Sequence, residues 1–108
     1  MRLGRRGRFH DLVERQLDLV ASDDADLLTE ASEAEAAWNA TTAADAEEAY
    51  GDYQLVVDAI ADRLLEIRES YAATLDEHSA VEYAAEFTRA ATKRYRRYAS
   101  LLADLELE

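Results

Sequence analysis

The fold is decided by residues 46–75, which read AEEAYGDYQLVVDAIADRLLEIRESYAATL. Apolar side chains recur in this stretch at spacings that mostly alternate between four and three residues. They are Ala46, Tyr50, Tyr53, Val57, Ile60, Leu64, Ile67, Tyr71 and Thr74 or Leu75. This spacing places them on one face of a long α-helix. Thr42, followed three residues later by Asp45, is a start signal, so we expect a helix over residues 43–77.

The segments on either side continue the same periodicity. The first stripe is Phe9, Val13, Leu17, Val20, Asp24, Leu27, Ala31, Ala34 and Trp38, which predicts a helix over residues 8–39. The last is Ala80, Ala84, Phe87, Ala91, Arg94 or Tyr95, Tyr98, Leu101 or Leu102, and Leu105, which predicts a helix over residues 79–106. Ser79 and Glu82 have the spacing of a capping box at its start.

One point in the first stripe allows two interpretations. The unbroken apolar register favours a continuous helix, whereas Ser22, Asp23 and Asp24 could instead cap a second helix, with a kink or split near residue 22. Asp24 also suggests two structural roles. It could form a partly buried ion pair with Arg94, or it could cap the kink while Tyr95 takes the place of Arg94 in the core.

The composition supports an all-α fold. The chain has no proline, three glycines and 22 alanines among 108 residues, and alanine has the highest helix propensity. Short connections between helices force antiparallel neighbours. We therefore expect an antiparallel up-down-up bundle of three long helices. In this interpretation residues 1–8 are a basic N-terminal arm and residues 9–106 are a single helical-bundle domain.

Charge is sorted along the chain, whose net charge is −12 from 24 acidic and 12 basic residues. Residues 1–10 contain four arginines and no acid, and residues 89–97 contain five basic residues and no acid. On a helix Arg89, Lys93 and Arg96 project away from Ala91, and Arg97 lies beside them. We call Arg89, Lys93, Arg96 and Arg97 the basic band.

The basic band predicts a non-enzymatic module that docks an acidic protein partner or a second copy of itself. For a homodimer, the complementary surface would be a row of acids on the second helix: Asp58, Asp62, Glu66 and Glu69. Alternatively, Glu82 and Glu86 pair with the band at helical spacing and leave a solvated face. A further alternative is binding of nucleic acid or an anionic surface through the arginine arm and the 89–97 segment, although a charge of −12 repels polyanions at long range.

The sequence contains no pattern typical of an enzyme or a cofactor site. It has no cysteine, no Ser-His-Asp arrangement and no glycine-rich phosphate loop. An alternative is a metal-dependent helical protein, because His10, His78 and Glu14 would meet at one end of the bundle. We expect a cytoplasmic protein without a membrane span, since no apolar run approaches the ~20 residues that a spanning helix needs.

Overall fold

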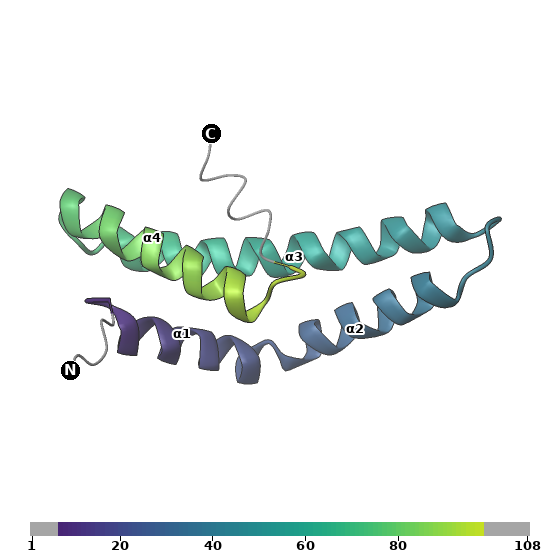
Figure 1. The fold of residues 1–108 in the computed structure, drawn as a ribbon, viewed down its shortest axis with the longest axis horizontal. Helices are drawn as coiled ribbons and strands as arrows, with labels where there is room; N and C mark the ends of the chain where they lie inside the picture. The colour runs from purple at the N-terminus through teal and green to yellow at the C-terminus, as the bar shows by residue number, and fades with distance from the viewer. Residues whose placement is uncertain (1–6, 99–108) are drawn as a thin grey trace.

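The computed structural model describes residues 7–98, which form four α-helices connected by short turns. The helices are α1 (His10–Asp23), α2 (Ala25–Ala40), α3 (Ala46–Ala72) and α4 (Glu77–Arg94). In Figure 1, α1 and α2 follow one another along one side, α3 runs back beside α2, and α4 lies beside both α3 and α1. The molecule is elongated, with extents of 53 × 31 × 24 Å. The all-α prediction is confirmed, but the prediction of three long helices is not, because this part of the chain forms four.

The expected continuous first helix is broken at Asp24. This residue has φ −110° and ψ 28°, outside the helical region, and it separates α1 from α2. Its amide still donates to the carbonyl of Val20 (2.9 Å), and its carbonyl accepts from the amide of Leu28 (3.1 Å). The hydroxyl of Ser22 bonds to the carbonyl of Leu19 (3.3 Å), a local contact that competes with regular helix. The split near residue 22 is therefore the interpretation that the structure supports.

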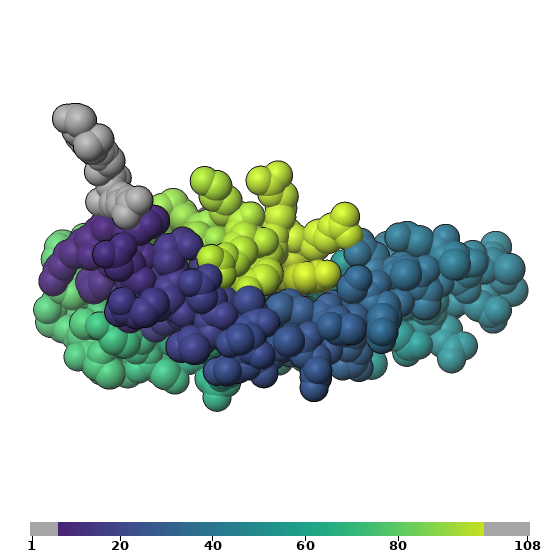
Figure 2. All heavy atoms as spheres, turned by 90° about the horizontal axis from the view of Figure 1, so that it is seen from below, coloured from purple at the N-terminus to yellow at the C-terminus, as the bar shows by residue number. Residues whose placement is uncertain are grey.

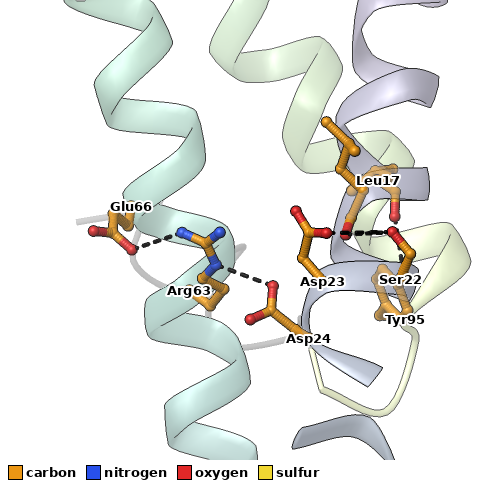
Figure 3. Close-up of polar contacts among 8 residues, drawn as sticks. Leu17, Ser22, Asp23, Asp24, Arg63, Glu66 and Tyr95 are labelled. Atoms are coloured by element: carbon orange, nitrogen blue, oxygen red, sulfur yellow. Dashed lines mark hydrogen bonds and ion pairs between the residues drawn. The ribbon is translucent and has the colours of Figure 1, made fainter. Parts of the chain in front are cut away.

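The side chain of Asp24 binds across the bundle (Figure 3). Its Oδ2 accepts from Nε of Arg63 on α3 at 3.0 Å, and Nη1 of the same guanidinium donates to Oε1 of Glu66 at 3.0 Å. These hydrogen bonds raise the pKa of Arg63. The expected pair between Asp24 and Arg94 is absent from residues 7–98, and Asp24 makes no side-chain capping bond at the start of α2.

The ends of α3 and α4 differ from the predicted ends. Helix α3 starts at Ala46 and ends at Ala72, so it is shorter than expected at both ends. Helix α4 starts before Ser79, because Asp76 is its cap: Oδ1 of Asp76 accepts from the Ser79 amide at 2.9 Å, and Oδ2 accepts from the Ser79 hydroxyl at 3.0 Å. Helix α4 ends at Arg94, and residues 95–98 form a turn rather than continuing the helix. The predicted stripe positions Leu101, Leu102 and Leu105, and Arg2, Arg5 and Arg6 of the predicted arm, lie outside the described residues.

The core lies where α1, α3 and α4 meet. Its most completely buried large side chains are Val13, Leu17, Val20, Ile60, Leu64, Tyr83 and Phe87. All but Tyr83 were predicted by the apolar stripes. Tyr83 replaces the expected Ala80 and Ala84 as the deepest residue of its turn, contacts the rings of Phe9, Tyr71 and Phe87, and donates to Oε1 of Gln16 at 2.8 Å. At this end of α4 the buried face is therefore rotated slightly relative to the apolar stripe that the sequence predicted.

A buried polar contact also joins α3 to α4. Arg68 is buried, and its Nη1 donates to the hydroxyl of Thr88 at 2.8 Å, while its Nε donates to Glu69 at 2.8 Å. The periodicity of the sequence did not indicate this contact. A buried guanidinium needs hydrogen-bond partners, so this pair ties the angular position of α4 to that of α3.

Helix α4 covers only part of the length of α3, and the other end of the molecule consists of α2 and the first half of α3 (Figure 1). There the ring of Trp38 stacks on Tyr53 (centroids 5.5 Å apart) and contacts Tyr50 (4.8 Å). Tyr50, predicted as a core residue, is 44% exposed, because two helices cannot enclose a side chain on every side. No helix among residues 7–98 is long and apolar enough to cross a membrane.

Replacing Leu64 by alanine tests the core assignment. Leu64 is completely buried, so Leu64→Ala should lower the free energy of unfolding by about 2–5 kcal/mol, through lost apolar burial and a residual cavity. Urea unfolding followed by circular dichroism measures this. Leu19→Ala is the matched control, since Leu19 is 58% exposed on α1 and should change stability by less than about 0.5 kcal/mol. Equal effects of the two substitutions would contradict the packing described here.

Tyr83 should make stability depend on pH in the alkaline range. Burial raises the pKa of Tyr83 from 10.0 to about 12, so the folded state keeps a proton that the unfolded chain releases. The stabilisation that comes from keeping the Tyr83 hydroxyl protonated in the folded state is complete below pH 10.0 and is lost as the pH rises through about 12. The free energy of unfolding, measured by urea titration across this range, should therefore fall more steeply for the natural chain than for Tyr83→Phe. The substituted chain also starts lower, because it lacks the bond to Gln16. Identical slopes would contradict the assignment.

Candidate interaction surface

The basic band lies on the outer surface of α4 and on the turn that follows it. Arg89 and Lys93 are one helical turn apart on α4, whereas Arg96 and Arg97 belong to the turn at residues 95–98. All four residues are exposed; helical spacing accounts for the exposure of Arg89 and Lys93, whereas Arg96 and Arg97 lie beyond the end of α4. Figure 2 shows side chains at the yellow end of the colour scale standing out from the surface between the two ends of the molecule.

In the alternative interpretation Glu82 and Glu86 pair with the band, but in the structure both bind elsewhere. Oε1 of Glu82 accepts from Nη1 of Arg8 at 3.3 Å, and Oε1 of Glu86 accepts from the backbone N–H of Phe9 at 3.1 Å. Both contacts tie the start of α1 to α4. The alternative in which these glutamates pair with Arg89 and Lys93 is therefore wrong.

Arg94 and one member of the basic band, Arg97, form ion pairs that connect this end of α4 to the other helices. Nη2 of Arg94 lies 3.1 Å from Oε1 of Glu14 and 2.9 Å from Oδ1 of Asp18, which links α4 to α1. Arg97 forms an ion pair with Glu35 and so links the turn after α4 to α2. Arg97, predicted as part of a free band, is thus already engaged within the chain.

The remaining members of the band have no acidic partner in the described part of the chain. Among residues 7–98, Arg89, Lys93 and Arg96 form no ion pair, although acids outnumber bases two to one in the sequence. We refer to Arg89, Lys93 and Arg96 as the unpaired cations. They are the members of the basic band that form no ion pair with a described residue.

Hollows in the surface flank the unpaired cations on two sides. One, of about 490 Å³, is lined by Thr88, Arg89, Thr92, Lys93 and Arg96. The other, of about 700 Å³, lies between α1 and α4, and its lining includes Arg89, Lys93, His10 and Glu14. Arg89 and Lys93 therefore border both hollows. A partner could place a carboxylate on either cation while packing an apolar side chain beside it.

The metal-binding alternative finds no ligand set in this region. His10 is half-buried and lines the larger hollow with Glu14, but the carboxylate of Glu14 is bound to Arg94. His78 is exposed in the first turn of α4. Within residues 7–98, no group of three or more histidine, cysteine, aspartate or glutamate side chains is placed to hold a metal ion.

The acidic row predicted on the second helix is partly engaged. Glu66 binds Arg63, and Glu69 binds Arg68, so these two carboxylates already have cationic partners. The same face of α3 carries Leu55, which is 70% exposed and which the core periodicity did not indicate. Its position outside the apolar stripe, next to Asp52 and Asp58 at helical spacing, is the signal in the sequence that could have identified it.

Comparisons with known proteins add no relative: a scan against protein-family models, a search of curated proteins and a search of solved structures gave no match.

Arg94 and Arg96 should differ in their effect on stability. Arg94→Ala removes contacts to two carboxylates and should lower the free energy of unfolding by up to about 1 kcal/mol, an effect that salt should weaken. Arg96→Ala removes no ion pair with a described residue and should change it by less than about 0.5 kcal/mol. Urea unfolding at low and high salt measures both. A larger cost for Arg96→Ala would show that the assignment of bound and unpaired cations is wrong.

Proposed function

We propose that this protein is a non-enzymatic helical interaction module that docks an acidic protein surface through the unpaired cations Arg89, Lys93 and Arg96. One observation carries the proposal: these cations are exposed, adjacent and without an ion-pair partner among residues 7–98, in a chain that has twice as many acids as bases. Nearby acids are held by Arg8, Arg94 and Arg97 instead.

The rigid placement of the band favours its use for binding. Arg94 and Arg97 fasten the end of α4 to α1 and α2, so the unpaired cations lie on an anchored part of the fold. A partner that binds them breaks no ion pair within the described residues. Charged groups at a rim mainly steer and orient a complex, and apolar contact supplies most of the affinity. The hollows beside Arg89 and Lys93 offer places for such contact.

An acidic protein fits the charge of the molecule better than a nucleic acid does. Nucleic acids are bound largely through phosphate contacts in a favourable electrostatic field, and this chain has a net charge of −12. A folded protein surface with a few carboxylates presents fewer negative charges than duplex DNA, which carries one per ~1.7 Å, and can meet three cations locally. The proposal keeps the cytoplasmic location expected from the sequence.

Several shifted pKa values belong to groups that hold the helices together. Hydrogen bonds from Ser79 lower the pKa of Asp76, which caps α4, and bonds to Asp24 and Glu66 raise the pKa of Arg63. Burial raises the pKa of Tyr53 and Tyr83 within the packed helices. Each of these shifts follows from a contact that stabilises the fold, and none of these groups lies in the basic band.

The proposal predicts that a fluorescently labelled poly-glutamate peptide binds the natural chain, as measured by anisotropy at low salt. Arg89→Glu should raise the dissociation constant about tenfold, because a favourable contact becomes a repulsive one. Arg15→Glu is the matched control: it makes the same change in net charge at an exposed position on α1, and Arg15 also has no ion pair within the described residues. Circular dichroism should show the same helicity for all three chains.

Two outcomes would contradict this proposal. Equal weakening by Arg89→Glu and Arg15→Glu would show that binding follows net charge and not the band. Tighter binding of a single-stranded oligonucleotide than of poly-glutamate, with the same dependence on Arg89, would favour nucleic-acid binding.

A further inference from the structure

We infer that the partner of the basic band is the outer face of α3 in a second copy of this chain, so that the protein forms a two-fold dimer in which Leu55 of each copy enters the hollow beside Thr88 and Thr92 of the other. The inference rests on the proposed function and names its partner. It joins two surfaces that residues 7–98 leave exposed.

The first surface is the α3 face around Leu55. The spacing of Asp52, Leu55, Asp58 and Asp62 is three, three and four residues, which places all four on one side of the helix. Leu55 is 70% exposed, the most exposed large apolar side chain in the described part of the chain. Asp52 and Asp62 are exposed and form no ion pair with a described residue, and Asp58 accepts a hydrogen bond only from Gln54 (3.1 Å) among them. This surface is thus an apolar knob surrounded by carboxylates.

The second surface has the opposite pattern. Thr88 and Thr92 line a hollow of about 490 Å³ that is rimmed by the three unpaired cations. A threonine side chain carries a methyl group, which can make apolar contact with leucine. An apolar recess surrounded by cations complements an apolar knob surrounded by carboxylates.

The spacing of the charges on the two helices also agrees. Arg89 and Lys93 are four residues apart on α4, and Asp58 and Asp62 are four residues apart on α3, so each pair spans about 6 Å along its helix axis. Two helices laid side by side could therefore bring both cations against both carboxylates. The segment 16–62, which includes most of this α3 face, contains no lysine or arginine that would repel the band.

In a dimer with a two-fold axis, the contact between the acidic surface of α3 and the basic surface of α4 forms twice. Helices α3 and α4 of one copy pack against each other, so each copy carries an acidic knob and a basic hollow on neighbouring helices. In a two-fold pair, residue i of one copy meets residue j of the other and the reverse contact follows by symmetry. Like-charge contacts, acid on acid or base on base, disfavour other arrangements of the two copies.

The test combines an apolar substitution with charge reversal. The mass of the natural chain, measured by sedimentation equilibrium, should rise from monomer to dimer with concentration. Leu55→Asp should weaken the dimer about tenfold or more, because it replaces the knob with a charge, whereas Leu19→Asp on α1 should leave the dimer unchanged. Circular dichroism should show that both variants keep the helicity of the natural chain.

Charge reversal then identifies the contacting surfaces. A chain with Asp58→Lys and Asp62→Lys, and a chain with Arg89→Glu and Lys93→Glu, should each be monomeric alone, since two like-charged faces would meet. A mixture of the two should form a heterodimer, because opposite charges then face each other at both contacts. Excess poly-glutamate should dissociate the natural dimer, since it competes for the band.

The outcomes separate this inference from the proposed function. A natural chain that stays monomeric at every concentration, but binds poly-glutamate through Arg89, overturns the dimer and leaves the docking function in place. A dimer that survives Leu55→Asp and both charge reversals overturns the assignment of the surfaces. Failure to bind poly-glutamate, together with a dimer insensitive to Arg89 and Lys93, overturns both.

Discussion

The packing of Tyr83 and Phe87 between α1 and α3 is the contact on which the rest of the structure depends. Both side chains are completely buried, and the ring of Tyr83 contacts Phe9 from the start of α1 as well as Tyr71 near the end of α3. This one region therefore joins segments from three helices. Because it fixes where α4 lies, it also determines which residues of α4 face outward, and the basic band is the outward face that results.

The short length of α4 gives the two ends of the molecule different properties. Where α4 is present, three helices enclose an apolar core, and the surrounding acids bind Arg8, Arg63 and Arg94 across helix boundaries. Beyond it, α2 and the first half of α3 form a two-helix end whose charged residues are predominantly acidic. At the three-helix end, several arginines form ion pairs between helices, and the unpaired cations lie on the surface. Because residues 16–62 contain no lysine or arginine, the two-helix end has no basic residue of its own to pair with its acids.

Much of the fold could be predicted from periodicity, because burial on one helix face repeats with a fixed spacing. Ile60, Leu64 and Phe87 are buried as expected for this reason. The break at Asp24 depends on competition between local hydrogen bonds and on Arg63, which lies 39 residues away in sequence, so spacing alone left two interpretations open. The depth of Tyr83 was missed because a rotation of α4 by a fraction of a turn moves burial from the alanines to the neighbouring tyrosine, and only tertiary contacts determine that rotation.

The residues that form the candidate surface could be predicted from the sequence, but the ion pairs around it could not. Helical spacing alone places Arg89 and Lys93 together on an exposed face, and the structure agrees. Which carboxylates neutralise which cations depends on long-range contacts: Glu82 binds Arg8, 74 residues away, rather than a neighbour on its own helix. Exposed ion pairs contribute only about 0.2–1 kcal/mol each, so small differences in geometry decide among competing partners. Among the described residues, Arg89 and Lys93 stay without an ion pair because Glu82 and Glu86 contact the start of α1 instead, and the proposed docking function rests on this arrangement.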